Sequence, residues 1–147
     1  MAFQVSTGLR NYMLDTGAFK TAMDLGLLRI YEGTVPTSVE DALGSANILC
    51  EVTVDGLGTG GTWEASAASG IISKNVAETW QGTNSDSGTA TFFRFVQVAD
   101  DGLADPTQLR IQGLVGLVGA ELNLSSVTLT VGATQTINHF NVALPSL

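Results

Sequence analysis

The segment 88–98 constrains the fold of this chain more than any other stretch. It reads Gly-Thr-Ala-Thr-Phe-Phe-Arg-Phe-Val-Gln-Val, without proline or internal glycine, which is typical of an extended strand. Because side chains alternate along a strand, Phe93 and Phe95 share one face and Arg94 lies on the other. Both faces are apolar in the middle, so we expect a central strand between two layers, with Arg94 as a buried charge. The candidates for its acidic partner are Glu51 and Glu78.

Further short strands are predicted on both sides of this segment. They cover residues 27–32, 48–54, 70–74, 78–82, 109–115, 121–124, 127–131 and 136–144. The turn-rich residues 83–88 would return the chain into the central strand as a hairpin, and residues 109–115 would pair with that strand from the other side. Eight or nine strands at short spacing, with no long helix between them, predict an all-β sandwich or jelly roll.

A short helical lead-in is expected at the N-terminus. Ser6 or Thr7 can cap a helix that places Leu9, Tyr12 and Met13 on one face, and a second short helical piece covers residues 18–25. A turn of helix is also expected over residues 39–42. We therefore expect a single domain over residues 1–147, in which residues 1–26 form the lead-in and residues 27–147 form the sandwich.

Composition narrows the partners and the compartment. The 147 residues include 14 acidic and six basic side chains, a formal charge of −8, which argues against nucleic acid or an anionic membrane surface as a partner. Cys50 is the only cysteine, so no intrachain disulfide and no cysteine-based zinc site can form, and its place in an alternating strand predicts a buried thiol. The sequence contains neither a signal-peptide pattern nor an apolar stretch long enough to span a membrane, so we expect folding in a cytoplasm.

No catalytic motif emerges from the polar residues. The loop 56–62 is rich in glycine but lacks the lysine and the following helix of a phosphate-binding loop. His139 is the only histidine, and no nucleophile elbow accompanies it. Three acidic residues in 100–105 have the spacing of turn residues, with Ca²⁺ binding as the less favoured alternative. We expect no enzyme activity, no catalytic residue, no metal and no cofactor. Carbohydrate binding is an alternative, in which three aromatic side chains form a platform for a sugar ring: Tyr31, Trp63 and Trp80.

Several phrases of the sequence occur together in a known family. They are the stretch from Leu-Arg-Ile-Tyr-Glu-Gly to Glu-Asp-Ala in 28–42, the strand that starts at residue 48, Gly-Thr-Ala-Thr-Phe-Phe-Arg in 88–94, and the block 109–145. In this combination, over nearly its whole length, the chain resembles a family of small virion structural proteins of tailed bacteriophages. The resemblance implies a β-sandwich or jelly-roll fold, and it most favours a capsid decoration, or cement, protein.

A decoration protein binds the mature capsid shell and stabilises it by many copies of a protein–protein contact. The resemblance therefore implies a location in the virion, with the major capsid protein and copies of the chain itself, as a dimer or trimer, for partners. The N-terminal segment is apolar enough to contact other subunits; the alternative is that it packs on its own sheet. Its candidate contact residues are Phe3, Val5, Leu9, Tyr12 and Met13. Two other functions stay open: a tail, neck or baseplate component, and a receptor- or carbohydrate-binding module.

Overall fold

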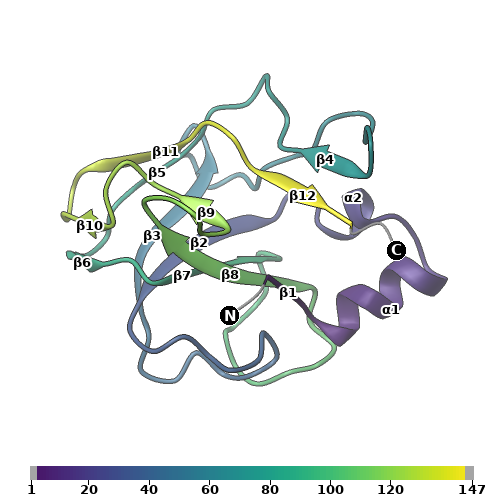
Figure 1. The fold of residues 1–147 in the computed structure, drawn as a ribbon, viewed down its shortest axis with the longest axis horizontal. Helices are drawn as coiled ribbons and strands as arrows, with labels where there is room; N and C mark the ends of the chain where they lie inside the picture. The colour runs from purple at the N-terminus through teal and green to yellow at the C-terminus, as the bar shows by residue number, and fades with distance from the viewer. Residues whose placement is uncertain (1–2, 145–147) are drawn as a thin grey trace.

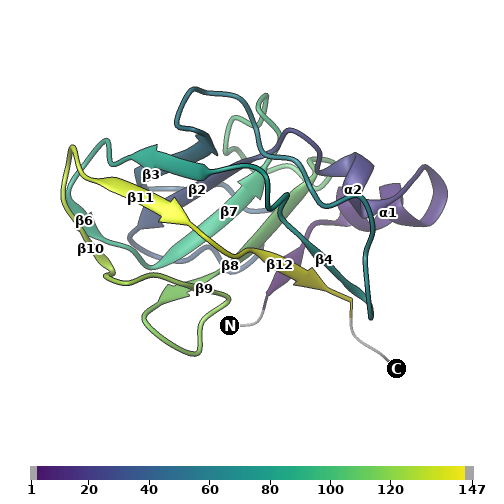
Figure 2. The same cartoon turned by 90° about the horizontal axis from the view of Figure 1, so that it is seen from above.

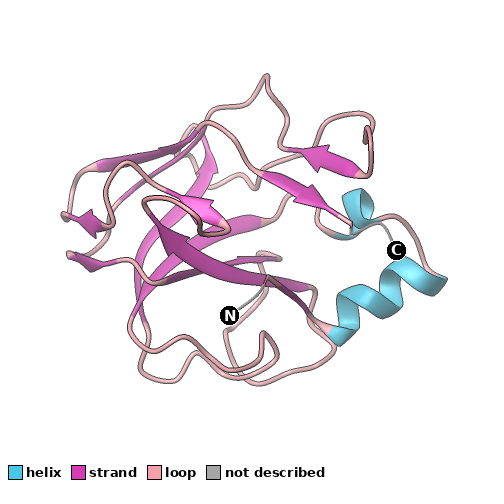
Figure 3. Ribbon diagram, in the orientation of Figure 1, coloured by secondary structure: helices cyan, strands magenta, loops and turns pink. Residues whose placement is uncertain are grey.

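The protein is a β protein with two short helices near its N-terminus. The computed structural model describes residues 3–144. Strand accounts for 38% of the structure and helix for 9%, which confirms the predicted all-β class with a short helical start. Figure 1 shows the strands gathered in a curled sheet, with both helices at one end of it. Figure 3 separates the two kinds of element by colour.

One large sheet and two small ribbons contain all the strands of the described residues. Across the sheet, the order is β1 (Gln4–Val5), β8 (Arg110–Gly116), β7 (Phe92–Val96), β2 (Leu27–Glu32), β3 (Asn47–Val54), β5 (Trp80–Thr83) and β11 (Thr134–Ile137). β9 (Leu122–Asn123) pairs in parallel with β8, and every other pair is antiparallel. The ribbons are β6 (Gly88–Thr89) with β10 (Thr128–Leu129), and β4 (Ile71–Ser73) with β12 (Asn141–Ala143).

The central strand predicted for residues 88–98 divides into β6 and β7. β7 lies between β2 and β8, so the predicted pairing with residues 109–115 is confirmed. The predicted hairpin is wrong, because β5 pairs with β3 and β11, while β6 leaves the sheet to pair with β10. The break falls at Ala90–Thr91, where the Thr91 N–H donates to Tyr31 O and the Thr91 carbonyl accepts from Val115 N. The last predicted strand is likewise divided, into β11 and β12.

The inner face of the sheet encloses an aromatic core. Trp63 lies at its centre, with ring centroids 5.2 to 5.9 Å from those of four other aromatic residues, and its indole N–H donates to Met23 O. Rings of this size contribute most of the apolar area that a small domain withdraws from water. The four partners are Phe19, Trp80, Phe95 and Phe140.

The N-terminal segment is part of this core. Ser6 caps α1 (Thr7–Asp15) by accepting a hydrogen bond from Leu9 N, as predicted, and α2 (Phe19–Ala22) follows. Leu9 is completely buried, and β1 adds a strand to the sheet beside β8. The two ends of the described chain lie on the same side of the molecule in Figure 2. The lead-in therefore shares one core with the sheet that follows it.

Two loops, rather than a second sheet, cover the outer face of β7 and β8. They are the connection between β2 and β3 and the connection between β7 and β8, which bond to each other through Leu43 N to Gly102 O and Asp105 N to Glu40 O. The helical turn expected over residues 39–42 is a non-helical turn. Ser38 N bonds to the Asp41 carboxylate and Glu40 N to the Ser38 hydroxyl, so side chains take the place of helix hydrogen bonds there.

Candidate functional site

Arg94 lies buried between the sheet and the two loops. Its side chain is 1% exposed, and its guanidinium donates to Gln112 Oε1 at 2.9 Å and to Asp41 O at 2.9 Å. Burial, and then the neighbouring Arg110 charge, lower the pKa of Arg94 to about 10. The predicted buried charge is confirmed, but the predicted partners are wrong. Glu51 instead pairs with Arg29 at 2.8 Å, and Glu78 accepts from Thr62 and Trp80.

A second buried charge beside Arg94 has a full partner. Arg110 is 0% exposed, and its guanidinium binds both carboxylate oxygens of Asp100, at 2.5 and 2.9 Å. Asp100 is a turn residue, as predicted, since its carboxylate accepts from Gly102 N at 2.8 Å, but its pair with Arg110 was not predicted from the sequence. The strand pattern could have indicated it. Arg110 and Gln112 lie two residues apart and so share one face of their strand, and polar side chains on a covered sheet face need hydrogen-bond partners from the loop above. Together, the hydrogen bonds of Arg94 and Arg110 hold the two loops to the sheet, so the role of these buried charges is structural.

The acidic residues considered as metal ligands and the single cysteine have structural roles in the fold. Within residues 3–144, no three His, Cys, Asp or Glu side chains are grouped so that they can hold a metal ion. Asp101 accepts from Leu103 N and Asp105 from Thr107 N, which are turn contacts. The Cys50 thiol is buried, and its desolvation raises its pKa to about 11, so it has little thiolate character.

The rings proposed for a sugar platform are unavailable to a ligand. Tyr31, Trp63 and Trp80 are each exposed by 4% or less, and all three lie in packed interiors. The prediction that these three residues form a carbohydrate-binding platform is therefore wrong. The end of the glycine-rich loop 56–62 packs inward, because Gly61 N donates to Gly26 O and the Trp80 ring lies where a Gly61 side chain would be, whereas residues 56–59 are exposed.

The N-terminal candidates for intersubunit contacts divide into two groups. Leu9 is completely buried in its own chain and has no surface to offer a partner, which corrects its assignment. The other four are half-buried and pack on the core of their own chain. Contact of these four with another subunit stays a prediction. They are Phe3, Val5, Tyr12 and Met13.

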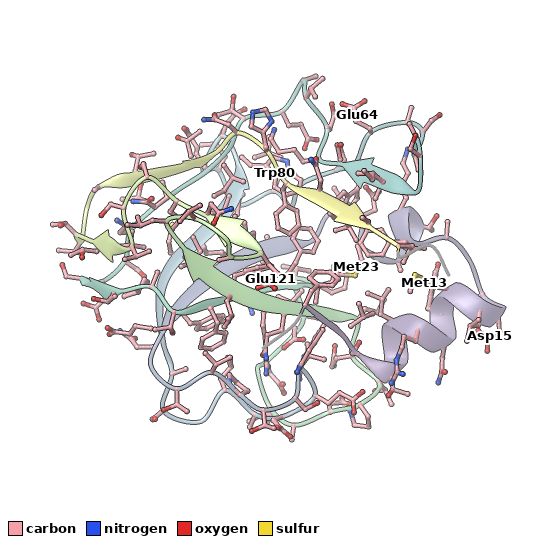
Figure 4. All side chains as sticks on the ribbon, in the orientation of Figure 1. Met13, Asp15, Met23, Glu64, Trp80 and Glu121 are labelled. Carbon is pink, nitrogen blue, oxygen red and sulfur yellow. The ribbon has the colours of Figure 1, made fainter. Side chains whose placement is uncertain are left out.

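Two adjoining cavities form a trough along one open side of the sheet. The first, about 460 Å³, is bounded by β9 and by the chain that runs from β11 into β12. The second, about 270 Å³, is bounded by Phe3, Phe93 and β12. Both cavities are lined by Glu121, Phe140 and Asn141, so they are neighbours. Figure 4 shows Glu121 close to β8. Sequence reasoning did not predict the trough, because it depends on which strands stay unpaired.

The surface of the described residues carries many exposed apolar side chains. Eleven Leu, Ile and Val side chains are at least 41% exposed, in a chain with only 14% charged residues. The four most exposed lie in separate parts of the fold: one in the last turn of α1, and three on the connections after β3, before β5 and after β8. Apolar side chains exposed singly also occur on monomeric proteins. These four are Leu14, Leu57, Val76 and Val118, at 81% to 88% exposure.

Comparisons with known proteins return no match. No family model matches the chain, and neither curated proteins nor solved structures give a significant similarity. Within residues 3–144, no helix is both long and apolar enough to cross a membrane.

Proposed function

We propose that this protein is a structural component of a tailed-phage virion, a capsid decoration protein that binds the mature shell through protein–protein contacts. The observation that carries the proposal is the set of exposed Leu, Ile and Val side chains on several connections of the fold. Exposed apolar area of this kind contributes to binding only when another protein covers it. A subunit held in a lattice is contacted from several sides, and these side chains point to such contacts.

Two further properties support the same proposal. The net charge of −8 disfavours contact with packaged nucleic acid and suits a position on the outside of a shell. The sequence resemblance to small virion structural proteins points in the same direction. The mechanism is linkage: a subunit that binds the expanded shell and not its precursor stabilises the expanded form by its binding free energy at each site.

The test is to add the purified protein to expanded shells that lack it. We expect saturable occupancy, measured by electron microscopy and gel densitometry, and a rise in the temperature at which the shells break. Precursor shells are the control and are expected to bind less. Absence of binding to expanded shells would refute the decoration role. Electron microscopy of labelled virions separates this role from a tail, neck or baseplate position, where the label would lie outside the shell.

A further inference from the structure

The large sheet is open along the trough. One end of the sheet is formed by β1 and β9, which border different parts of β8, and the other end by β11. In Figure 1, β11 and β12 follow one another above β8, β9 and β1. An open sheet end presents backbone N–H and C=O groups that no neighbouring strand binds.

The register shows which backbone groups of β12 point into the trough. Lys74 N donates to Phe140 O and Leu144 N donates to Gly70 O, so residues 140, 142 and 144 are the ones that bond to β4. In an antiparallel pair, the alternate residues direct their N–H and C=O groups away from the partner strand. These alternate residues are Asn141 and Ala143, and both line the trough. Within residues 3–144, their N–H groups have no hydrogen-bond partner.

Phe3, which borders the trough, leads into β1, and the outer edge of β1 has the same property. Ser6 N donates to Arg110 O, so Gln4 and Ser6 bond to β8 and Val5 directs its N–H and C=O groups away from it. Further along β8, the Leu114 N–H also points outward, and there the Glu121 carboxylate accepts from it at 2.8 Å. One exposed donor of β8 is thus satisfied by a side chain where a strand is missing. The trough lies between this edge of the large sheet and the chain that runs from β11 through the β4–β12 ribbon.

The lining of the trough defines the chemistry of what fits it. The part beside β12 has a floor of aromatic rings, since Phe93 and Phe140 are buried beneath it and Phe3 borders it. Among the described residues that line the trough, Glu121 is the only carboxylate, His139 is the other titratable side chain, and there is no lysine or arginine. An acidic segment would meet an uncompensated negative charge, in a molecule whose own net charge is −8.

We propose that the trough binds an extended strand of a partner polypeptide, which pairs with β12 through the outward backbone groups of Asn141 and Ala143. The bound segment has apolar side chains at alternate positions, which rest on the phenylalanine floor, and it is neutral or basic. Backbone hydrogen bonds supply the affinity and the alternate side chains the selectivity, as in other cases of strand addition. This inference rests on the proposed assembly function, because it specifies how one partner segment is held.

The first experiment uses model peptides and needs no shell. The probe is a seven-residue peptide of alternating valine and threonine with lysine at both ends. Amide hydrogen exchange of the 15N-labelled protein is followed by NMR. We expect the exchange of the Asn141 and Ala143 amides to slow at least about tenfold when the peptide binds, as for newly hydrogen-bonded groups. The same peptide with N-methylated valines, which lacks their N–H donors, is expected to give no protection.

A second peptide tests the charge argument. With glutamate in place of both lysines, the peptide is expected to bind at least about fivefold more weakly, because of Glu121 and the net charge of the protein. Equal affinity of the two peptides would overturn the stated chemistry of the partner. If neither the lysine peptide nor the glutamate peptide protects the two amides, the strand-addition proposal itself is overturned.

A variant of the protein tests the outward edge of β12 directly. Ala143→Pro removes an N–H that the β4–β12 ribbon does not use, and proline is tolerated at such edge positions. We expect this variant to keep its unfolding midpoint and to lose at least about tenfold in affinity for the lysine peptide, whereas Ala143→Val, which keeps the N–H, retains binding. Unchanged binding by a folded Ala143→Pro would contradict the proposal. If that variant does not fold, the N-methylated peptide decides.

The shell experiment separates the two proposals. When the wild-type protein binds shells and Ala143→Pro does not, both proposals hold. If both proteins bind shells equally and the two amides stay unprotected, the decoration role stands and strand addition fails. If the wild type protects its amides on the peptide but does not bind shells, strand addition stands and the decoration role fails. Concentration-dependent self-association that protects the same two amides would overturn the choice of a different polypeptide as partner.

Discussion

Asp100 and Arg110 form an ion pair that is almost completely withdrawn from water. Their side chains are 2% and 0% exposed. Arg110 also donates to Leu103 O, so the pair joins β8 to the loop that follows β7. Removing one partner of such a pair leaves a buried charge without compensation, which costs far more than the pair itself contributes.

Asp100→Asn is therefore expected to be strongly destabilising. The free energy of unfolding should fall by about 3 to 5 kcal/mol, because the Arg110 guanidinium loses its counter-charge where water cannot replace it. Urea denaturation measures the change. Asp101→Asn is the matched control, since Asp101 is exposed and contacts only a turn amide, and it should cost under about 1 kcal/mol. Similar losses in the two variants would show that the pair is not the anchor of the loop.

The Cys50 thiol predicts a pH dependence. Burial raises its pKa from 9.0 to about 11, so the unfolded chain releases the proton first and stability falls as pH rises from about 9 to 11. The loss from this group should reach about 1 kcal/mol at pH 10, relative to pH 8. Between pH 8 and pH 10, the free energy of unfolding of Cys50→Ala should therefore fall by about 1 kcal/mol less than that of the wild type, whatever its value at pH 8. Urea curves at both pH values test this, and parallel losses in the two proteins would contradict it.

At the scale of elements, the join between α1 and the sheet depends on one hydroxyl group. Ser6 Oγ donates to Gln108 O at 2.6 Å and accepts from Leu9 N and Arg110 N at 3.2 and 3.1 Å. Ser6 is completely buried. The same atom therefore caps the helix and fixes it against the start of β8.

Ser6→Ala should lower the free energy of unfolding by about 2 to 3 kcal/mol, since the helix loses its cap and buried backbone groups lose a partner. The loss should be accompanied by faster amide exchange at the start of α1. Thr7→Ala is the control, because the Thr7 hydroxyl contacts only the exposed Arg10 guanidinium and the Glu40 carboxylate, and it is expected to change stability by about 1 kcal/mol or less. Equal effects of the two variants would mean that Ser6 does not anchor the helix.

The elements also show what sequence patterns can and cannot predict. The Ser6 cap follows from residues close to it in the sequence, and the pairing of β7 with β8 follows because consecutive strands usually lie side by side. The partners of Arg94 do not, because a strand pattern identifies a covered face without identifying what covers it. Carbonyl groups of a loop more than fifty residues away bind that side chain. The trough was missed for the same reason, since alternation along β12 gives no information about an absent neighbour.

Across the whole molecule, folding and assembly place different demands on apolar side chains. The core withdraws its Leu, Ile, Val and aromatic residues from water, whereas Val118 is 88% exposed and Leu57 82% exposed. Exposed side chains of this kind contribute little to the stability of the isolated chain. Under the proposed function, a neighbouring subunit covers some of them, and their contribution is then to binding.

Aspartate substitutions at the four most exposed positions separate these two demands. Leu57→Asp, Val76→Asp and Val118→Asp should each change the free energy of unfolding by under about 0.5 kcal/mol. Leu14→Asp should cost about 1 kcal/mol, because it adds a negative charge to the last turn of α1. At least one should weaken binding to expanded shells tenfold or more, because burying an unpaired carboxylate at an interface is costly. Unfolding by urea and shell occupancy at a series of concentrations measure the two effects. Ile30→Asp, at a completely buried core position, is the opposite control and should fail to fold. If all four surface variants fold and bind as the wild type does, these side chains do not form the contacts with the shell. The exposed apolar side chains would then no longer support the decoration role.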